Sequence, residues 1–472
     1  MVWNLANYKE NVAVIDETGK EYTYLTLSEK SDEIASQVKS GRSLIFCLCQ
    51  NEIGSLAGYL GFLNHQIVPV LLDAHLNREL LGFLLDTYKP DYLWVPVTMS
   101  GEFTNCTTEY EVLDYTLLKT KYTHAYALHE DLALLLTTSG STGSPKFVRQ
   151  TYKNIIANIE SIVEYLELDA TERPITTLQM NYTYGLSIIN THMWVGASII
   201  LTKKTLMQKE FWDQFKAYEA TSFGGVPYTY EMLERLRFFR MNLPSLRTMT
   251  QAGGKLSPES HRRFAEYAAD TGRHFVVMYG QTEATARMSY LPWQKSLEKY
   301  GSVGVAIPGG KFSIMDVDGN EVSEPEVTGE LVYEGANVTM GYATCGEDLG
   351  KGDEWHGRLF TGDMAKFDSD GYYYITGRKK RFLKIFGSRV NLDEAEQLVK
   401  SAYRGVDCAC SGVDDKMYVF ITDGRKTEEI RRFLAEKMNF HSSAFEVMHI
   451  DTIPRNDAGK VLYNKLGKDF QK

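Results

Sequence analysis

Cysteine and long apolar runs are scarce in this sequence. Its six cysteines among 472 residues are too few for a disulfide framework. Cys47/Cys49 and Cys408/Cys410 form C-x-C pairs inside strand-like runs with no matching His or Cys nearby, so we expect buried thiols rather than a metal site. The most apolar stretch, residues 186–201, is interrupted by polar residues and is too short to cross a bilayer.

Basic residues are outnumbered as well. Lys plus Arg number 51 against 61 Asp plus Glu, which gives a formal net charge of −10. Such a chain repels nucleic-acid backbones and anionic lipid surfaces, so no nucleic-acid partner is expected. No membrane span is expected either, because the most apolar stretch is too short and too polar. The N-terminus has no basic start followed by an apolar core, so no signal peptide is predicted and the expected compartment is the cytoplasm.

The chain is too long for one compact core, so two or more domains are expected. The first two-thirds alternate short apolar runs with helical patterns, which indicates α/β layering. Buried strands are predicted at residues 43–49, 68–72, 132–137, 221–226 and 274–278, and helical faces at 155–163, 392–401 and 427–438.

The texture of the sequence changes after residue 301, where short strands and turns dominate. The turn signals are Asp318-Gly319, Thr328-Gly329 and Asp370-Gly371. The charged run at 378–381 indicates an exposed linker, which divides the chain into an N-terminal domain at residues 1–379 and a C-terminal domain at 380–472. The predicted fold class is α/β: a large N-terminal domain of layered α/β sheets with a small β-rich subdomain, and a small α+β C-terminal domain.

The clearest chemical signal is a loop rich in glycine and hydroxyl groups that follows the strand predicted at 132–137. It reads Thr137-Thr138-Ser139-Gly140-Ser141-Thr142-Gly143-Ser144-Pro145-Lys146. Glycines let backbone N–H groups turn toward an anion, hydroxyls add donors, and Lys146 adds a compact positive charge for a phosphate. A flexible surface loop is the alternative. The G-x-x-x-x-G-K-[ST] spacing is absent, which disfavours a P-loop kinase or GTPase.

Four more motifs follow in order, and each has an ordinary structural explanation when taken alone. They are Gln251-Ala252-Gly253-Gly254-Lys255, Tyr279-Gly280-Gln281-Thr282-Glu283, Phe360-Thr361-Gly362-Asp363 with the later Gly377-Arg378, and the C-terminal pair Lys384-Ile385-Phe386-Gly387-Ser388-Arg389 and Ile453-Pro454-Arg455-Asn456-Asp457-Ala458-Gly459-Lys460. Gly253 and Gly254 can be explained by a strand-to-helix turn. Asp363 can be explained by an ion pair within a hairpin, and Lys460 by an exposed position near the C-terminus.

Taken together, the motifs resemble those of the superfamily of adenylate-forming enzymes: acyl- and aryl-CoA synthetases, peptide-synthetase adenylation domains and firefly luciferase. The family signature T-S-G-[ST]-T-G-x-P-K-G is matched from Thr138 onward, except that Phe147 replaces the last glycine and Tyr152 stands where a histidine often follows. In the C-terminal motif, Leu392 and Ala395 depart from the usual Pro and Ile. The resemblance spans residues 133–460, with the motifs in the family's order.

The resemblance implies a role for each motif. The phosphates of ATP would contact the loop residues, the adenine would lie between the second and third motifs, and the ribose would bind to Asp363 beside Arg378. Glu283 would hold Mg²⁺, and Lys460 would be the adenylation lysine. The implied nucleotide-binding residues are Thr138, Ser139, Gly140, Ser141, Thr142, Gly143, Lys146, Gly253, Gly254, Lys255, Tyr279, Gly280, Gln281, Thr282, Asp363, Arg378 and Lys460, of which Thr138 and Lys460, with Glu283, are the catalytic candidates.

The implied reaction has two halves. A carboxylate attacks the α-phosphorus of ATP and pyrophosphate leaves; a thiol then attacks the acyl-adenylate and AMP leaves. In this family the small C-terminal domain rotates between the two steps, so it is expected to be mobile. Lys380 takes the hinge position, and Gly387 and Arg389 belong to the segment used in the thiol step. Coenzyme A is the expected acceptor, and the phosphopantetheine of an acyl-carrier protein is the alternative.

The acid itself is constrained by one negative feature. Amino-acid-activating relatives carry an aspartate for the substrate ammonium where Gly185 stands, and no acidic residue lies between Asn181 and Gly196. A buried ammonium needs a counter-charge, so a fatty, aryl or hydroxylated acid is favoured over an α-amino acid. The candidate pocket residues are Tyr184, Gly185, Tyr228 and Gly304, with Gly253 beside them.

Three other functions remain open at this level. The chain could bind nucleotide without turnover, could stop at the adenylate or pass it to a nucleophile other than a thiol, or could be an unrelated P-loop NTPase. Retention of Lys146, Glu283, Asp363, Arg378 and Lys460 argues against the first. The loop spacing argues against the last.

Overall fold

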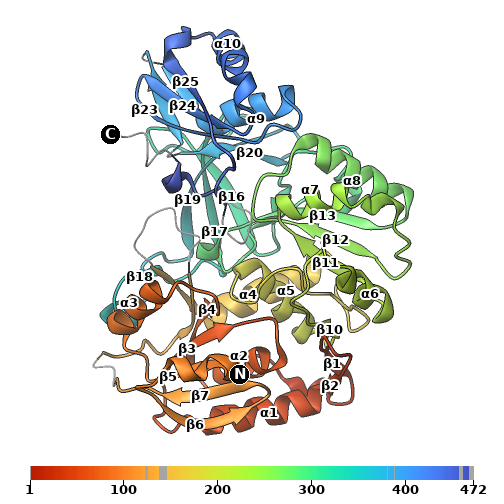
Figure 1. Cartoon of the computed structure of the whole chain (residues 1–472), viewed down its shortest axis with the longest axis vertical. Helices are drawn as coiled ribbons and strands as arrows, with labels where there is room; N and C mark the ends of the chain where they lie inside the picture. Colours follow the sequence, from red (N-terminus) through yellow and green to blue (C-terminus); the bar gives the residue numbers. More distant parts are fainter. Residues whose placement is uncertain are drawn as a thin grey trace. The chain divides into compact units, whose positions relative to one another are not determined.

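The computed structural model of the chain describes residues 2–122, 126–137, 146–379, 381–386, 388–455 and 461–466. The chain packs as two compact units. The first comprises Met1–Gly140, Ser144–Lys311 and Tyr333–Leu359, and the second includes Phe312–Val332 and Phe360–Lys472. The sheets and helices of both units confirm the predicted α/β class (Figure 1).

An eight-stranded sheet lies in the first unit, in the order β18-β9-β8-β4-β3-β5-β7-β6. Its strands are β3 (Leu44–Cys49), β4 (Val68–Asp73), β5 (Tyr92–Pro96), β6 (Thr107–Val112), β7 (Tyr115–Lys119), β8 (Leu132–Thr137), β9 (Phe147–Thr151) and β18 (Tyr342–Ala343). The helices before α4 are α1 (Tyr24–Ser36), α2 (Ile53–Asn64) and α3 (Arg78–Tyr88). A small sheet of β1 (Val12–Ile15), β2 (Glu21–Thr23) and β10 (Ile199–Ile200) completes this region.

The predicted strands at 43–49, 68–72 and 132–137 are confirmed in β3, β4 and β8, because each is a continuous apolar run buried on both faces. The C-x-C thiols are free and buried, as expected, in β3 and in β23 (Cys408–Val413). Desolvation by burial raises the pKa of Cys47 well above its usual range, which keeps it a neutral packing residue.

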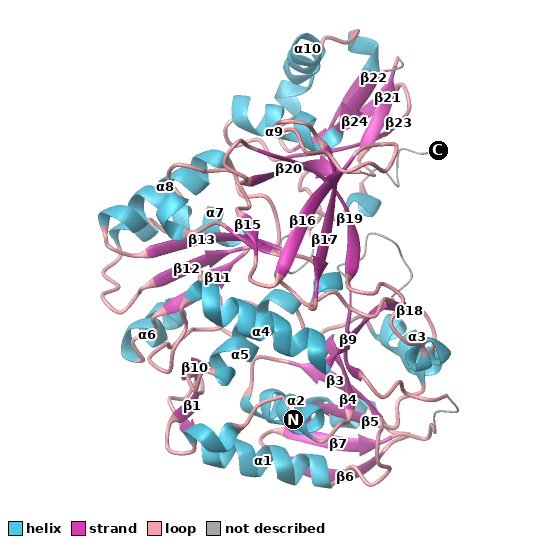
Figure 2. Cartoon of the chain, turned by 180° about the vertical axis from the view of Figure 1, so that it is seen from behind, coloured by secondary structure: helices cyan, strands magenta, loops and turns pink. Residues whose placement is uncertain are grey.

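A second, five-stranded sheet in the first unit runs in the order β11-β12-β13-β14-β15. Its strands are β11 (Ser222–Gly225), β12 (Thr248–Gln251), β13 (His274–Tyr279), β14 (Ser289–Tyr290) and β15 (Val305–Ala306). The helices α6 (Lys209–Ala217), α7 (Pro227–Arg235) and α8 (Pro258–Asp270) accompany its three parallel strands (Figure 2).

Two helices, α4 (Tyr152–Leu166) and α5 (Thr183–Trp194), lie between these sheets (Figure 1). Ile155 and Ile159 of α4 pack into the core of the eight-stranded sheet, as the predicted apolar face requires. Tyr184 of α5 packs on the other side, against Ala252, which follows β12, and against Val276 and Met278 of β13. A strand that the pattern did not predict, β9, separates the glycine-rich loop from α4. It pairs antiparallel with β8, so the loop connects two paired strands rather than a strand and a helix.

The second unit holds most of the sheet β16-β17-β19-β20 and a small α+β fold. The sheet strands are β16 (Gly310–Met315), β17 (Gly329–Gly335), β19 (Arg358–Phe367) and β20 (Tyr373–Arg378). The rest comprises β21 (Phe382–Ile385), β22 (Ser388–Asn391), α9 (Leu392–Ala402), β23, β24 (Lys416–Ile421), α10 (Thr427–Met438) and β25 (Phe445–His449). The predicted helices at 392–401 and 427–438 are confirmed in α9 and α10. A hinge at residue 380 stays a prediction, because packing in one conformation does not measure motion.

Candidate active site

A phenol connects two of the predicted site residues in the first unit. The Nζ atom of Lys146 lies 3.4 Å from the ring centroid of Tyr342, and the Tyr342 hydroxyl donates to Oε1 of Glu283 at 2.7 Å. Tyr342 is on β18, which pairs antiparallel with β9 immediately after Lys146. Tyr342 therefore contacts both Lys146, the predicted phosphate-binding lysine, and Glu283, the predicted metal-binding carboxylate. These two residues are 137 positions apart in the chain.

The loop that carries Glu283 is fixed by its backbone. It follows β13, and a Cβ atom at Gly280 would lie 1.7 Å from the carbonyl oxygen of Ala286, so only glycine fits there. The carbonyl of Glu283 accepts from the amide of Thr339 at 3.0 Å, and the side chain of Gln281 donates to the Tyr279 hydroxyl at 3.2 Å. The Glu283 carboxylate is thus positioned by an ordered turn rather than by a free loop end.

The second predicted wall of the adenine site follows β12. Gln251 is buried and donates to the carbonyls of Ala252 at 3.1 Å and Gly254 at 3.0 Å, which folds the loop back on itself. Gly253 has a φ of +82°, and a Cβ there would lie 2.5 Å from the Tyr182 hydroxyl. Because β12 and β13 are parallel neighbours, both loops leave the same edge of the sheet, where ligands of α/β sheets bind.

The predicted ribose residues pair in the second unit. Asp363 on β19 and Arg378 on β20 are cross-strand partners, and Arg378 Nε lies 2.7 Å from Asp363 Oδ1. The Asp363 amide also donates to Thr361 Oγ1 at 3.1 Å. The expected proximity of the two residues is therefore observed, together with an ion pair that a hairpin alone also explains.

Several predicted residues lie outside the described part of the chain. They are Thr138, Ser139, Gly140, Ser141, Thr142, Gly143, Lys380, Gly387 and Lys460. Arg389 is described in its backbone, which pairs with Lys384 across β21 and β22. The proposed roles of Arg389 and of the residues outside the described part of the chain rest on the sequence resemblance alone.

The four candidate pocket residues have different environments. Tyr184 is buried, bonds Thr250 Oγ1 through its hydroxyl at 2.9 Å and lies beneath the guanidinium of Arg287, 4.4 Å from ring centroid to Cζ. Tyr228, at the start of α7, is 44% exposed. Gly185 and Gly304 are required by packing, because a Cβ would lie 2.4 Å and 1.8 Å from backbone oxygens. The missing acid at 185 thus has a steric cause in this fold.

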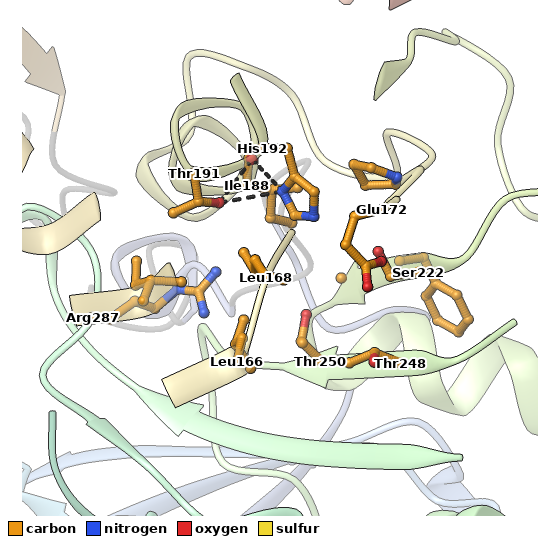
Figure 3. Close-up of a pocket in the computed structure, with 14 residues that line it drawn as sticks. Leu166, Leu168, Glu172, Ile188, Thr191, His192, Ser222, Thr248, Thr250 and Arg287 are labelled. Carbon is orange, nitrogen blue, oxygen red and sulfur yellow. Dashed lines mark hydrogen bonds between the residues drawn. The ribbon is translucent and has the colours of Figure 1, made fainter. Parts of the chain in front are cut away.

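A cavity of about 20 Å³ lies in the first unit between the α4–α5 layer and β11–β12 (Figure 3). Its lining is Ile162, Leu166, Leu168, Glu172, Pro174, Ile188, Thr191, His192, Ser222, Phe223, Gly224, Thr248, Thr250 and Arg287. Sequence reasoning missed Arg287 and His192. An arginine in the run Ala284-Thr285-Ala286-Arg287-Met288, just before a buried strand, is the signal that was available.

The described residues hold neither a cluster of metal-ligating side chains nor a membrane-spanning helix. Among the described residues, no group of three His, Cys, Asp or Glu side chains could hold a metal ion. Within the same ranges, no helix combines the length and apolar character needed to cross a membrane.

Comparisons with known proteins agree on one family. The sequence model of the family described as "AMP-binding enzyme" matches residues 1–343. The chain is 28% identical to peroxisomal OPC-8:0-CoA ligase 1 of Arabidopsis thaliana over 72% of its length and 26% identical to an oxalate–CoA ligase of Saccharomyces cerevisiae over 74%. These matches span 64% and 65% of the relatives' own length, slightly less than two thirds.

Solved structures show the same fold. An o-succinylbenzoate CoA synthetase from Bacillus subtilis, in complex with its acyl-adenylate intermediate, superposes with a TM-score of 0.79 at 22% identity. The superposition covers 98% of this chain and 97% of that one. The same enzyme has also been solved with ATP and a magnesium ion, with a TM-score of 0.79 at 21% identity. At these identities the likeness supports the two-domain fold and nothing finer.

Proposed function

Because the chain belongs to the AMP-binding enzyme family, we propose that it activates a carboxylic acid with ATP as an acyl-adenylate and then transfers the acyl group to a thiol. Pyrophosphate leaves in the first step and AMP in the second. Coenzyme A is the proposed acceptor, and the names of the relatives, which are CoA ligases, support that choice.

The observation that carries the proposal is the Lys146–Tyr342–Glu283 arrangement. Adenylation brings two anions together, so it needs fixed positive charge close to the phosphates. Lys146 lies on the same phenol ring whose hydroxyl holds Glu283, so a cation for phosphate and a carboxylate for metal are close together. Both are fixed by the pairing of β9 with β18 and by the turn at Gly280.

The residues present fit a magnesium ion. Mg²⁺ is commonly held by one or two carboxylates together with substrate phosphates, and it needs no protein-only cage. Tyr342 fixes Oε1 of Glu283, and a carboxylate has a second oxygen with which to bind a metal. When bound, the ion would neutralise charge on the phosphate oxygens as pyrophosphate leaves.

The remaining roles are proposals that follow the sequence motifs. The backbone at Gly253 and the ring of Tyr279 would bind the adenine from two loops at one sheet edge, and Asp363 would accept hydrogen bonds from the ribose hydroxyls. Arg378, the ionic partner of Asp363, would keep that carboxylate charged and oriented. Lys460 would stabilise the developing charge during acyl-adenylate formation.

The decisive experiment is an exchange assay. Purified protein is incubated with ATP, Mg²⁺ and labelled pyrophosphate, and exchange into ATP is measured across a panel of acids. AMP release is then measured with coenzyme A, with a phosphopantetheinylated carrier protein, or with neither. The proposal expects acid-dependent exchange that requires Mg²⁺, and AMP release that coenzyme A stimulates. Absence of exchange with every acid would refute it, and stimulation by the carrier protein alone would reassign the acceptor.

A further inference from the structure

Arg287 is a buried cation with neutral partners. Its side chain is 2% exposed. One terminal nitrogen donates to Ser187 Oγ at 2.9 Å, and the other to the Tyr165 hydroxyl at 3.2 Å and to the sulfur of Met278. The guanidinium also lies over the ring of Tyr184. None of these groups carries a negative charge.

The guanidinium therefore lacks a counter-ion within the described part of the chain. Glu172 lines the far side of the same cavity (Figure 3) and has another ionic partner. Arg247 lies 3.5 Å from its Oε1, and Thr221 donates to its Oε2 at 2.6 Å. An isolated charge in a protein interior costs several kcal/mol unless it is paired. A second buried arginine, Arg149, follows the usual rule and pairs with Glu354.

The polar atoms left unpaired gather at this cavity. Arg287 Nε and His192 Nε2 are both buried and lack a partner among the described residues. His192 Nδ1 donates to the carbonyl of Ile188 at 2.7 Å, so Nε2 carries a lone pair, and burial lowers the pKa of this imidazole to about 4. The cavity thus offers a cationic donor on one side and a neutral acceptor on another, with room for a group the size of one or two water molecules.

Two residues that line the cavity are close in sequence to the proposed adenylation loops. Thr250 is three residues before Gly253 on β12, and Arg287 is four residues after Glu283. The Arg287 carbonyl is clamped by the side-chain amides of Asn158 at 3.0 Å and Asn337 at 2.9 Å, so the guanidinium starts from a fixed backbone. Small residues on β11 and β12, among them Gly224, create the space.

We propose that this chain activates an acid that carries a second anionic group, a dicarboxylic acid in the simplest case, and that Arg287 binds that distal carboxylate. The inference rests on the proposed adenylation function and names the substrate class of the same site. The reacting carboxylate attacks the α-phosphorus of ATP. The distal carboxylate enters the cavity and pairs with the guanidinium of Arg287. Neutral and cationic substituents at that end are disfavoured.

The test compares matched acids in the pyrophosphate exchange assay. Straight-chain monocarboxylates and α,ω-dicarboxylates of equal length, and benzoate beside its carboxylated derivatives, are assayed at a pH where all carboxyls are ionised. For its best chain length, the wild-type protein is expected to prefer the dicarboxylate by about 10- to 100-fold in kcat/KM. Arg287→Met abolishes this preference, and Arg287→Lys retains part of it because the charge survives without the planar fork.

Controls separate binding from folding. Arg263→Met, at an exposed arginine that pairs with Glu234, keeps the dicarboxylate preference. Arg287→Met leaves the thermal midpoint of the unliganded protein unchanged or higher, because Ser187 still donates to the Tyr184 carbonyl and Tyr165 to Met278. Arg149→Met lowers that midpoint, because the buried guanidinium donates to the backbone carbonyls of Tyr342, Lys351 and Met340, which then lose their donor.

Three outcomes would overturn the inference. One is a wild-type protein that prefers monocarboxylates, another is an Arg287→Met protein that keeps the dicarboxylate preference, and the third is a loss of thermal stability in Arg287→Met as large as in Arg149→Met. Exchange with monocarboxylates alone would leave the proposed function intact while refuting this inference. Exchange with no acid would refute the proposed function itself.

Discussion

At the scale of single residues, Tyr342 brings together two charged side chains, Lys146 and Glu283, that are far apart in the sequence. Its ring contacts a lysine and its hydroxyl binds a carboxylate, and contacts of these two kinds each contribute about 1 kcal/mol. The T-shaped contact with Trp355, at 5.0 Å between ring centroids, fixes the orientation of the phenol. Tyr342 lies outside the five sequence motifs, and nothing in its spacing indicated a contact with Lys146.

Tyr342→Phe keeps the ring and removes the hydrogen bond to Glu283. We expect kcat for pyrophosphate exchange to fall about 3- to 10-fold, the loss that one hydrogen bond produces, and the Mg²⁺ concentration for half-maximal rate to rise. Tyr122→Phe is the matched control, because Tyr122 donates to Asp86 at 2.6 Å at an exposed position. An unchanged Mg²⁺ requirement in Tyr342→Phe would contradict a positioning role.

His192 makes stability depend on pH. Its pKa is lowered to about 4 in the folded protein from about 6.5 when unfolded. Between these values the unfolded chain binds more protons, so the free energy of unfolding falls as pH drops from 6.5 toward 4, by about 3 kcal/mol at most for this group. Urea unfolding at pH 7 and pH 5 measures it. His192→Gln should flatten the difference, whereas the exposed His75→Gln should not.

At the scale of secondary-structure elements, the start of α5 shows why a sequence comparison could misread a glycine. The backbone at Gly185 approaches the carbonyl of Gln179, where a Cβ would be 2.4 Å away. From the sequence, the absence of an aspartate at this position indicates that the substrate is not an α-amino acid. In the fold, packing also explains the glycine, because no side chain fits at that position without a shift.

Gly185→Ala and Gly82→Ala are a matched pair of helix substitutions. Gly82 lies within α3, and a Cβ added there would have open space to at least 4 Å, so alanine should stabilise by up to about 1 kcal/mol through helix propensity. At Gly185 the clash with Gln179 should outweigh that gain and destabilise by about 1–3 kcal/mol. Urea unfolding compares the two, and equal stabilisation of both variants would refute the steric explanation.

Elements whose own apolar pattern indicates a strand or a helix were predictable, and elements that depend on pairing with a distant strand were not. The strand β8 and the helix α10 match their predicted bounds because their patterns are self-contained. The strand β9 carries Arg149 and Gln150 in a run of five residues and exists because it pairs with β8. The site divides in the same way: the motif residues were predictable from spacing, while Arg287 is recognised only by what surrounds it in three dimensions.

At the scale of the whole molecule, the predicted residues divide between two compact units. Lys146, Tyr279 and Glu283 belong to the first, and Asp363 and Arg378 to the second. Arg381, the first described residue after position 380, is held by Asp393, Glu396 and the ring of Tyr463, whose centroid lies 3.7 Å from its Cζ. These contacts tie Arg381 to residues that follow it in the chain. The residues just before position 380 belong to the same unit, and the Arg378 amide donates to Asp393 Oδ2 at 3.1 Å, so the hinge stays a prediction from the sequence.

Lys380→Pro and Lys460→Ala should impair different half-reactions. Proline fixes φ at residue 380, so rotation about the hinge is restricted and acyl transfer to coenzyme A should fall by more than pyrophosphate exchange. Lys460→Ala should instead impair exchange while sparing thioester formation from supplied acyl-adenylate. Rapid-quench assays of each half-reaction measure the split, with Lys380→Ala as the control that removes the side chain but leaves the backbone free. Equal losses in both half-reactions for either variant would contradict its assigned role, because a hinge and an adenylation lysine act at different steps of the same cycle.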